Sequence, residues 1–224
     1  MNQSSYFNYF CLECPILILQ TQSMDKSLLK FDDFFRSACY FEASLVIVAA
    51  FLGWVADIDP FKNIYFSETA IAYGVLGTIP LFLMFLALEK IQGESVTNIR
   101  KLLLNTLGPG LHRYHWTDLF MLAAIAGVSE ELLFRGVIQP WIEISWGITA
   151  GLIVSNIIFG LVHAVTPLYA VLATLVGIYL GLSLDYGGDR NLLTPIIIHG
   201  FYDFLAFVAL MRAYRSGLKS AAKD

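Results

Sequence analysis

Glu130, Glu131 and Arg135 lie inside a run from Trp116 to Ile142 that is otherwise apolar enough to cross a membrane. An ionisable side chain at bilayer depth is costly unless it is paired or faces a wet cavity, so such groups usually serve a function. In a helix, Glu131 and Arg135 share a face because they are four residues apart, whereas Glu130 lies about 100° away. The spacing predicts a structural ion pair between Glu131 and Arg135 and leaves Glu130 for chemistry. The alternative is a buried ion pair with a spare glutamate solvated at a helix end.

Two more polar pairs lie in apolar runs further along the chain: Phe159 with His163, and His199 with Asp203. Taken singly, each histidine could be an ordinary core residue. Glu130 precedes His163 by 33 residues, so the two would face each other in an antiparallel helix pair with its turn near residues 146 and 147. At 1.5 Å per residue, Glu130 and His163 lie ~25 Å from that turn. Counting from the start of the last apolar run places His199 only ~10 Å from the same side of the membrane. We therefore expect the loop before the last helix to dip or the helices to tilt.

The same residue types could bind a metal ion instead. His199 and Asp203 have the i, i+4 spacing of two ligands on one helix face, and Glu130 and His163 could complete a set of four. Residue types alone therefore leave two kinds of site open. One is metal-free, and the other is a zinc site formed by Glu130, His163, His199 and Asp203.

The composition defines the environment of these side chains. The chain has 224 residues, of which 57% are hydrophobic and 14% charged, and its mean hydropathy is +0.66. These values are typical of a polytopic membrane protein and not of a soluble domain. The net charge of −4 provides no basic stripe, so nucleic acid is not an expected partner.

Six long apolar runs predict an all-α membrane protein, a bundle of about six transmembrane helices plus a surface amphipathic helix. Glu42, about one turn into the first run, is interpreted as a snorkelling side chain without a catalytic role. The amphipathic segment 91–107 is predicted to lie on the membrane and to end at Gly108-Pro109-Gly110. The predicted spans are 38–56, 70–88, 116–142, 148–165, 168–186 and from about 192 to before Arg212.

Lysines and arginines predict the orientation, because cytoplasmic loops carry the excess. Eleven lie on the side of both termini, and only Lys62 and Arg190 lie on the other. We expect an integral membrane protein in a bacterial inner membrane, with both termini cytoplasmic and with membrane lipid as a partner. Its expected parts are a partly disordered cytoplasmic segment (1–36), the first two spans with the interfacial helix (37–115), a catalytic core of four spans (116–212) and a cytoplasmic tail (213–224).

The N-terminal segment carries few signals. Cys11 and Cys14 form a C-x-x-C without a second Cys/His pair, so we interpret them as small apolar residues. The first residues lack the positive region of a signal peptide. We expect residues 1–23 to be poorly ordered, and Met24 is an alternative start.

The three polar clusters, taken in order, resemble the motifs of the CPBP family. They read E-E-x-x-x-R at Glu130, F-x-x-x-H at Phe159 and H-x-x-x-[N/D] at His199. This family includes the CAAX prenyl proteases and bacteriocin-processing enzymes, and its members are also described as glutamic-type intramembrane proteases. The resemblance covers roughly Asp118 to Phe207, and each motif lies on its own predicted helix.

The resemblance implies an intramembrane endopeptidase, a hydrolase without a cofactor that cuts membrane-associated peptides or proteins. It does not imply that the substrate is prenylated. By this resemblance Glu130 is the general base and His163 shares its water, while His199 and Asp203 face the oxyanion. It also makes Glu131 and Arg135 the structural pair and Phe159 the motif aromatic.

Asp203 departs from the asparagine that is common in the family. An ionised aspartate cannot donate a hydrogen bond to an oxyanion, so Asp203 could instead orient His199 or, in an older interpretation of this family as metalloproteases, bind zinc. Two other functions stay open. A small proton-coupled transporter would also use intramembrane Glu and His, although the chain shows no internal repeat. A non-catalytic scaffold or immunity protein could keep the same fold.

Overall fold

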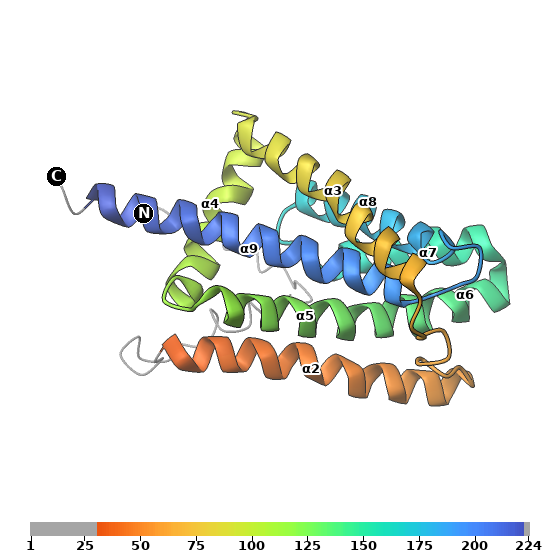
Figure 1. The fold of residues 1–224 in the computed structure, drawn as a ribbon. Coiled ribbons are helices and arrows are strands. Elements are labelled where there is room, and N and C mark those ends of the chain that lie inside the picture. Colours follow the sequence, from red (N-terminus) through yellow and green to blue (C-terminus); the bar gives the residue numbers. More distant parts are fainter. Residues whose placement is uncertain (1–30, 222–224) are drawn as a thin grey trace, which may run out of the picture.

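The computed structural model describes residues 31–221, with side chains from Phe34 onward. This part of the chain contains helices and no strand, which confirms the expected all-α class (Figure 1). The predictions about residues 1–23 lie outside the described residues. In chain order the helices are α2 (Phe31–Ala56), α3 (Glu68–Lys90), α4 (Glu94–Leu111), α5 (Trp116–Leu133), η1 (Phe134–Ile138), α6 (Gln139–Trp146), α7 (Ile148–Val162), α8 (Pro167–Ser183) and α9 (Leu193–Ala221).

Three of these helices are long and apolar enough to cross a membrane: α2 from Phe34 onward, α3 and α9. Pro80 lies inside α3, as expected for a membrane helix. Helices α7 and α8 are also apolar but shorter, with 15 and 17 residues. A ~30 Å hydrocarbon core needs about 20 helical residues, so six complete spans remain a prediction.

Helix α5 occupies the centre of the bundle. It packs between α2 and α9, and α9 also packs against α3 (Figure 1). Helix α2 runs in the same direction as α5, and α9 runs against both (Figure 1). Helix α7 contacts both α6 and α8 at the other end of the bundle. Helix α5 therefore has a long packing interface, with α2 on one side and α9 on the other.

Apolar side chains form two separate clusters along this interface. The first contains Leu119 and Leu122 of α5, Leu210 of α9 and Phe35 of α2. The second contains Leu132 and Leu133 of α5 and Ala49 of α2, with Ile196 of α9 packed against it. Most of the ionisable side chains of the spans lie between the two clusters along these helices. On α7, His163 lies just beyond the second cluster. We call this set the polar layer: Glu42, Glu130, Glu131, His163, His199 and Asp203.

The loop before α9 folds into the bundle. Leu184 and Leu192 are fully buried in the second cluster, beside Val137. The amide of Asn191 donates to Leu184 O (2.9 Å), and the amide of Leu192 donates to Asn63 O (2.8 Å). Helix α9 therefore begins beside η1 and not at the far end of α6. This inward loop removes the depth mismatch between His199 and Glu130 that simple counting predicts.

The predicted third span is not one uninterrupted α-helix. Residues 134–138 form a π-helical turn, in which Gln139 N donates to Phe134 O. Single π turns of this kind occur often at functional sites. A Cβ at Gly136 would lie 2.8 Å from Pro60 O, so a glycine here admits the preceding loop. No pattern in the sequence predicted this turn.

The prediction that Gly108-Pro109-Gly110 ends the amphipathic helix is wrong. Helix α4 continues through these residues to Leu111, with Pro109 inside it. A Cβ at Gly108 would meet the Tyr214 ring at 2.3 Å, and one at Gly110 would meet the Phe34 ring at 2.3 Å. The glycines therefore allow two aromatic rings to pack on α4, and this tertiary contact overrides the local helix-breaking tendency.

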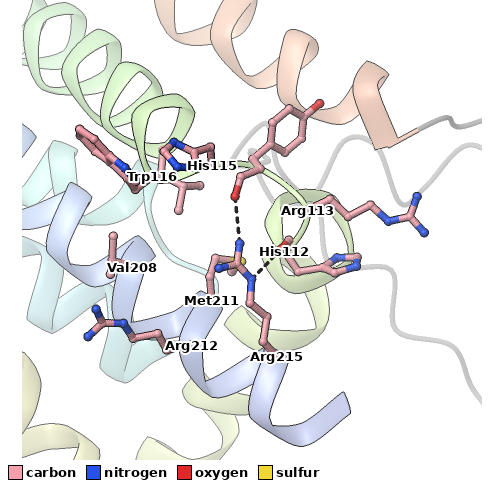
Figure 2. Close-up of a pocket in the computed structure, with 10 residues that line it drawn as sticks. His112, Arg113, His115, Trp116, Val208, Met211, Arg212 and Arg215 are labelled. Carbon is pink, nitrogen blue, oxygen red and sulfur yellow. Dashed lines mark hydrogen bonds between the residues drawn. The ribbon is translucent and has the colours of Figure 1, made fainter. Parts of the chain in front are cut away.

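Helix α9 also extends beyond the predicted end of the sixth span before Arg212 and reaches Ala221. In its added part, Arg215 donates from Nε to His112 O (2.7 Å) and from Nη2 to Tyr114 O (2.9 Å), which fastens the α4–α5 loop to α9 (Figure 2). Residues of the α4–α5 loop and of α9 line a pocket of about 540 Å³. None of the candidate catalytic residues lines this pocket.

The arginines around this pocket do not converge on one point. Arg113 and Arg212 point away from each other, whereas Arg215 is held by backbone carbonyls (Figure 2). His115 forms the N-cap of α5, where Nδ1 accepts from Thr117 N, and His112 Nδ1 lies 3.0 Å from Gly108 O. Local contacts within the α4–α5 region therefore occupy the Nδ1 atoms of both histidines.

The orientation of the chain leads to a first prediction. Reporters fused after Asp224 or within residues 93–106 should report a cytoplasmic location, and one within residues 187–191 should report an external location, because of the distribution of lysine and arginine. Paired phosphatase and fluorescent-protein fusions would measure this. An external reading at the C-terminus would show that the number of spans is odd.

Candidate active site

Glu130 lies at the meeting point of three helices. Its Oε2 is 3.5 Å from His163 Nε2 and 4.0 Å from His199 Nε2. This oxygen is buried and accepts no hydrogen bond from the described part of the chain. The structure therefore brings together one carboxylate and two imidazoles, from α5, from the C-terminal end of α7 and from α9.

His163 is oriented by the end of its own helix. It is the C-cap residue of α7, and its Nδ1 lies 2.8 Å from Phe159 O. A carbonyl oxygen only accepts hydrogen bonds, so Nδ1 carries the hydrogen and Nε2 is directed toward Glu130. The F-x-x-x-H spacing thus fixes both the ring direction and the tautomer of His163.

His199 connects the two adjacent glutamates. Its Nδ1 lies 2.8 Å from Glu131 Oε1, and its Nε2 lies 3.5 Å from Asp203 Oδ2. If Nδ1 donates to Glu131, a neutral ring presents a lone pair to the carboxyl groups of Asp203 and Glu130. This contact between acceptor atoms becomes favourable when a proton lies on Nε2 or on one of these carboxyl groups. His199 and Asp203 therefore lie on one face, as their spacing predicts.

The predicted ion pair between Glu131 and Arg135 is confirmed. Arg135 Nη1 donates to Glu131 Oε1 (2.8 Å), and both side chains are completely buried. Arg135 Nη2 also donates to Asn156 Oδ1 and to Gly177 O, each at 2.8 Å. A buried ion pair is stable only when such additional hydrogen bonds satisfy the remaining donors. Arg135 thereby ties η1 to α7 and α8.

Phe159 packs among these groups. Its ring centroid lies 4.9 Å from Phe134 and 4.4 Å from His163, and the Arg135 guanidinium lies 4.7 Å from its centre. A cation over an aromatic face is attracted by the ring quadrupole. The motif aromatic therefore supports both the ion pair and the imidazole of His163.

Sequence reasoning missed Asn156 as part of this network. Its amide oxygen accepts from Arg135, and its Nδ2 donates to Leu152 O (2.6 Å). The signal was present, since Asn156 is a polar residue in an apolar run and lies seven residues before His163, on the same helix face.

The interpretation of Glu42 as a snorkelling side chain is not supported. Its Oε2 is buried and has no hydrogen-bond partner within the described part of the chain. Its charge is repelled by Glu130 and Asp203 and attracted by His199 and His163. Glu42 therefore faces the candidate site and not the membrane surface, because α2 packs along α5.

The candidate residues do not form a metal-ligand set as they are placed. Among the described residues, no three His, Cys, Asp or Glu side chains gather closely enough to hold a metal ion. His199 also directs Nδ1 at Glu131, which is bound to Arg135. We therefore derive no catalytic step through a metal.

The fold and the site together define a helical membrane protein with a buried acid–base cluster. Residues 112–205 match the family model described as "Type II CAAX prenyl endopeptidase Rce1-like". This match confirms the resemblance to the CPBP family for that part of the chain, which includes Glu130, Glu131, Arg135, Phe159, His163, His199 and Asp203. No curated protein and no solved structure matches the chain.

Proposed function

We propose that this protein is an intramembrane endopeptidase that hydrolyses membrane-associated peptides or proteins, without nucleic acid as a partner. We place it in a bacterial inner membrane, with both termini in the cytoplasm. The observation that carries the proposal is the position of Glu130 Oε2, buried and unpartnered within 4.0 Å of two imidazoles from other helices. The family match supports a protease, and it leaves the nature of the substrate open.

The geometry suits water activation by a carboxylate. Glu130 Oε2 and His163 Nε2 are 3.5 Å apart, so one water beside the pair could form a hydrogen bond with each of them. Glu130 takes a proton from this water as its oxygen attacks the peptide carbonyl carbon. A protonated His199 Nε2 can donate to the oxyanion that forms, and a preorganised donor of this kind lowers the energy of the tetrahedral intermediate. Glu131 keeps His199 in place through Nδ1.

The proposal is tested by incubating the detergent-purified protein with a peptide library derived from membrane proteins. Mass spectrometry then identifies new peptide termini, and the Glu130→Gln protein gives the background. New termini with the wild type alone would support peptidase activity. Absence of new termini with the wild type would overturn it and favour a transporter or a binding protein.

Asp203 separates a metal-free site from a zinc site. In the metal-free site, Asp203→Asn replaces a carboxylate 3.5 Å from His199 Nε2 by a neutral group of the same shape that can donate, so activity should persist or rise. If Asp203 is a ligand, the same change weakens metal binding and activity together. The measurements are peptidase activity with and without a strong chelator, and metal content by mass spectrometry. Loss of activity in the variant, sensitivity to the chelator and stoichiometric zinc would establish the metal site.

A further inference from the structure

Hydrolysis of an amide requires a second proton transfer, because the departing nitrogen leaves as a neutral amine only if it is protonated. In the proposed mechanism Glu130 ends the attack step protonated. It can return that proton itself, or a second group can supply one. The polar layer contains such a group outside the region that matches the family, on α2.

Glu42 is the acidic residue of the polar layer without an ion-pair partner. None of the ion pairs within residues 34–221 includes it, whereas Glu130, Glu131 and Asp203 each have an imidazole or guanidinium nitrogen within 4.0 Å. Its buried Oε2 also has no hydrogen-bond partner among the described residues, as is true of Oε2 in Glu130 and in Glu131. A buried polar atom without a protein partner usually faces water or a ligand. Glu42 therefore shares with Glu130 the features of a group that contacts what the site binds.

A charge count indicates the state of this carboxyl group. The polar layer and its guanidinium contain four carboxyl groups and at most three cations, since both imidazoles and Arg135 can be positive. A buried excess of negative charge is costly, so at least one carboxyl group holds a proton. Glu42 is the least costly place for it, because the other three carboxylates have cationic or imidazole partners.

Other titratable groups also face Glu42. They are Glu130 of α5, His163 at the end of α7, His199 and Asp203 of α9, and Cys39 one turn earlier on α2. The two acidic groups among them repel an ionised Glu42, and the two histidines attract it. The charge count places a proton on Glu42 while Glu130 is ionised and ready to act as a base. The two glutamates thus have complementary protonation states.

We propose that Glu42 is the general acid of the reaction and delivers a proton to the departing amine. This inference rests on the proposed peptidase function. In the first step, a water O–H bond breaks, its proton passes to Glu130, and the oxygen bonds to the carbonyl carbon. In the second step the C–N bond breaks while the nitrogen takes the proton of Glu42. Proton transfer from Glu130 to Glu42 then restores both groups.

The test uses two substrates with one acyl group. One is a peptide cleaved by the wild type in the library assay, and the other is the nitrophenyl ester of the same acyl part, whose leaving group needs no proton. With Glu42→Gln, kcat for the peptide should fall by about 10²-fold or more, and kcat for the ester should stay near the wild-type value. Glu130→Gln should lose both activities, because the attack step is common to both. Glu42→Asp should retain part of the peptide activity.

The pH profile gives a second readout. Peptide cleavage by the wild type needs the proton of Glu42 and ester cleavage does not, so the pH profiles of the two substrates should differ. Exposed Glu94 provides the matched control, and Glu94→Gln should leave both activities unchanged. Equal loss of both activities in Glu42→Gln, or no loss, would overturn the general-acid role.

Two outcomes separate failure of this inference from failure of the proposed function. If the wild type cleaves neither substrate, the peptidase proposal fails. If Glu42→Gln does not fold, the wild-type protein alone tests the role of Glu42. Identical pH profiles for its cleavage of the peptide and of the ester would overturn that role.

Discussion

The Glu130→Gln protein is expected to fold normally and to lose peptide cleavage by about 10²-fold to 10⁴-fold, the usual contribution of a general base. Glutamine has the same shape as glutamate but cannot take a proton from water. Its amide can still fill the space near His163 and His199, so packing is preserved. Initial rates of peptide cleavage, measured at equal protein concentration in detergent, would give the ratio.

Two controls make this result specific. The thermal unfolding midpoint of Glu130→Gln should match that of the wild type, and Glu94→Gln at the exposed start of α4 should keep full activity. Cleavage by Glu130→Gln at nearly the wild-type rate would show that Glu130 is not the base.

Glu131→Gln should instead destabilise the fold, by about 3–5 kcal/mol, because it leaves the completely buried Arg135 without its counter-charge. The same change removes the charge that faces His199 Nδ1 at 2.8 Å. Denaturant unfolding in detergent, with yield as a second readout, would measure the loss.

A double variant provides the control for this prediction. Glu131→Gln combined with Arg135→Gln removes both buried charges, so it should be more stable than the sum of the two single changes predicts. A Glu131→Gln protein of normal stability without activity would contradict the structural role and would place Glu131 in the catalytic step.

Much of the fold could be predicted from local pattern. Apolar runs set the positions of the long helices, since helices satisfy the backbone hydrogen bonds that lipid cannot. The boundaries of α3 and α8 differ from the predicted spans by only a few residues. The π turn at 134–138 and the inward loop at 184–192 were not predictable, because packing between segments distant in sequence decides them.

In the candidate site, too, some contacts could be predicted from the sequence and others depend on packing between helices. Glu131 with Arg135, and His199 with Asp203, are pairs at helical spacing, so geometry along one helix predicted their contact. The sequence also marked Glu130 and His163 as candidates. That Glu130 lies within 4.0 Å of both His163 and His199 depends on how three helices pack.

Composition and residue spacing were enough to predict the helical membrane class, the three motifs and the two intrahelical pairs. Packing between helices was needed to show that Asn156 completes the Arg135 network and that Glu42 of α2 faces the site. A helix exposes its polar residue in a direction set by the neighbours it packs against. On a lipid-facing side of α2, Glu42 would reach the membrane surface. It reaches the acid–base cluster because it lies on the side of α2 that contacts α5.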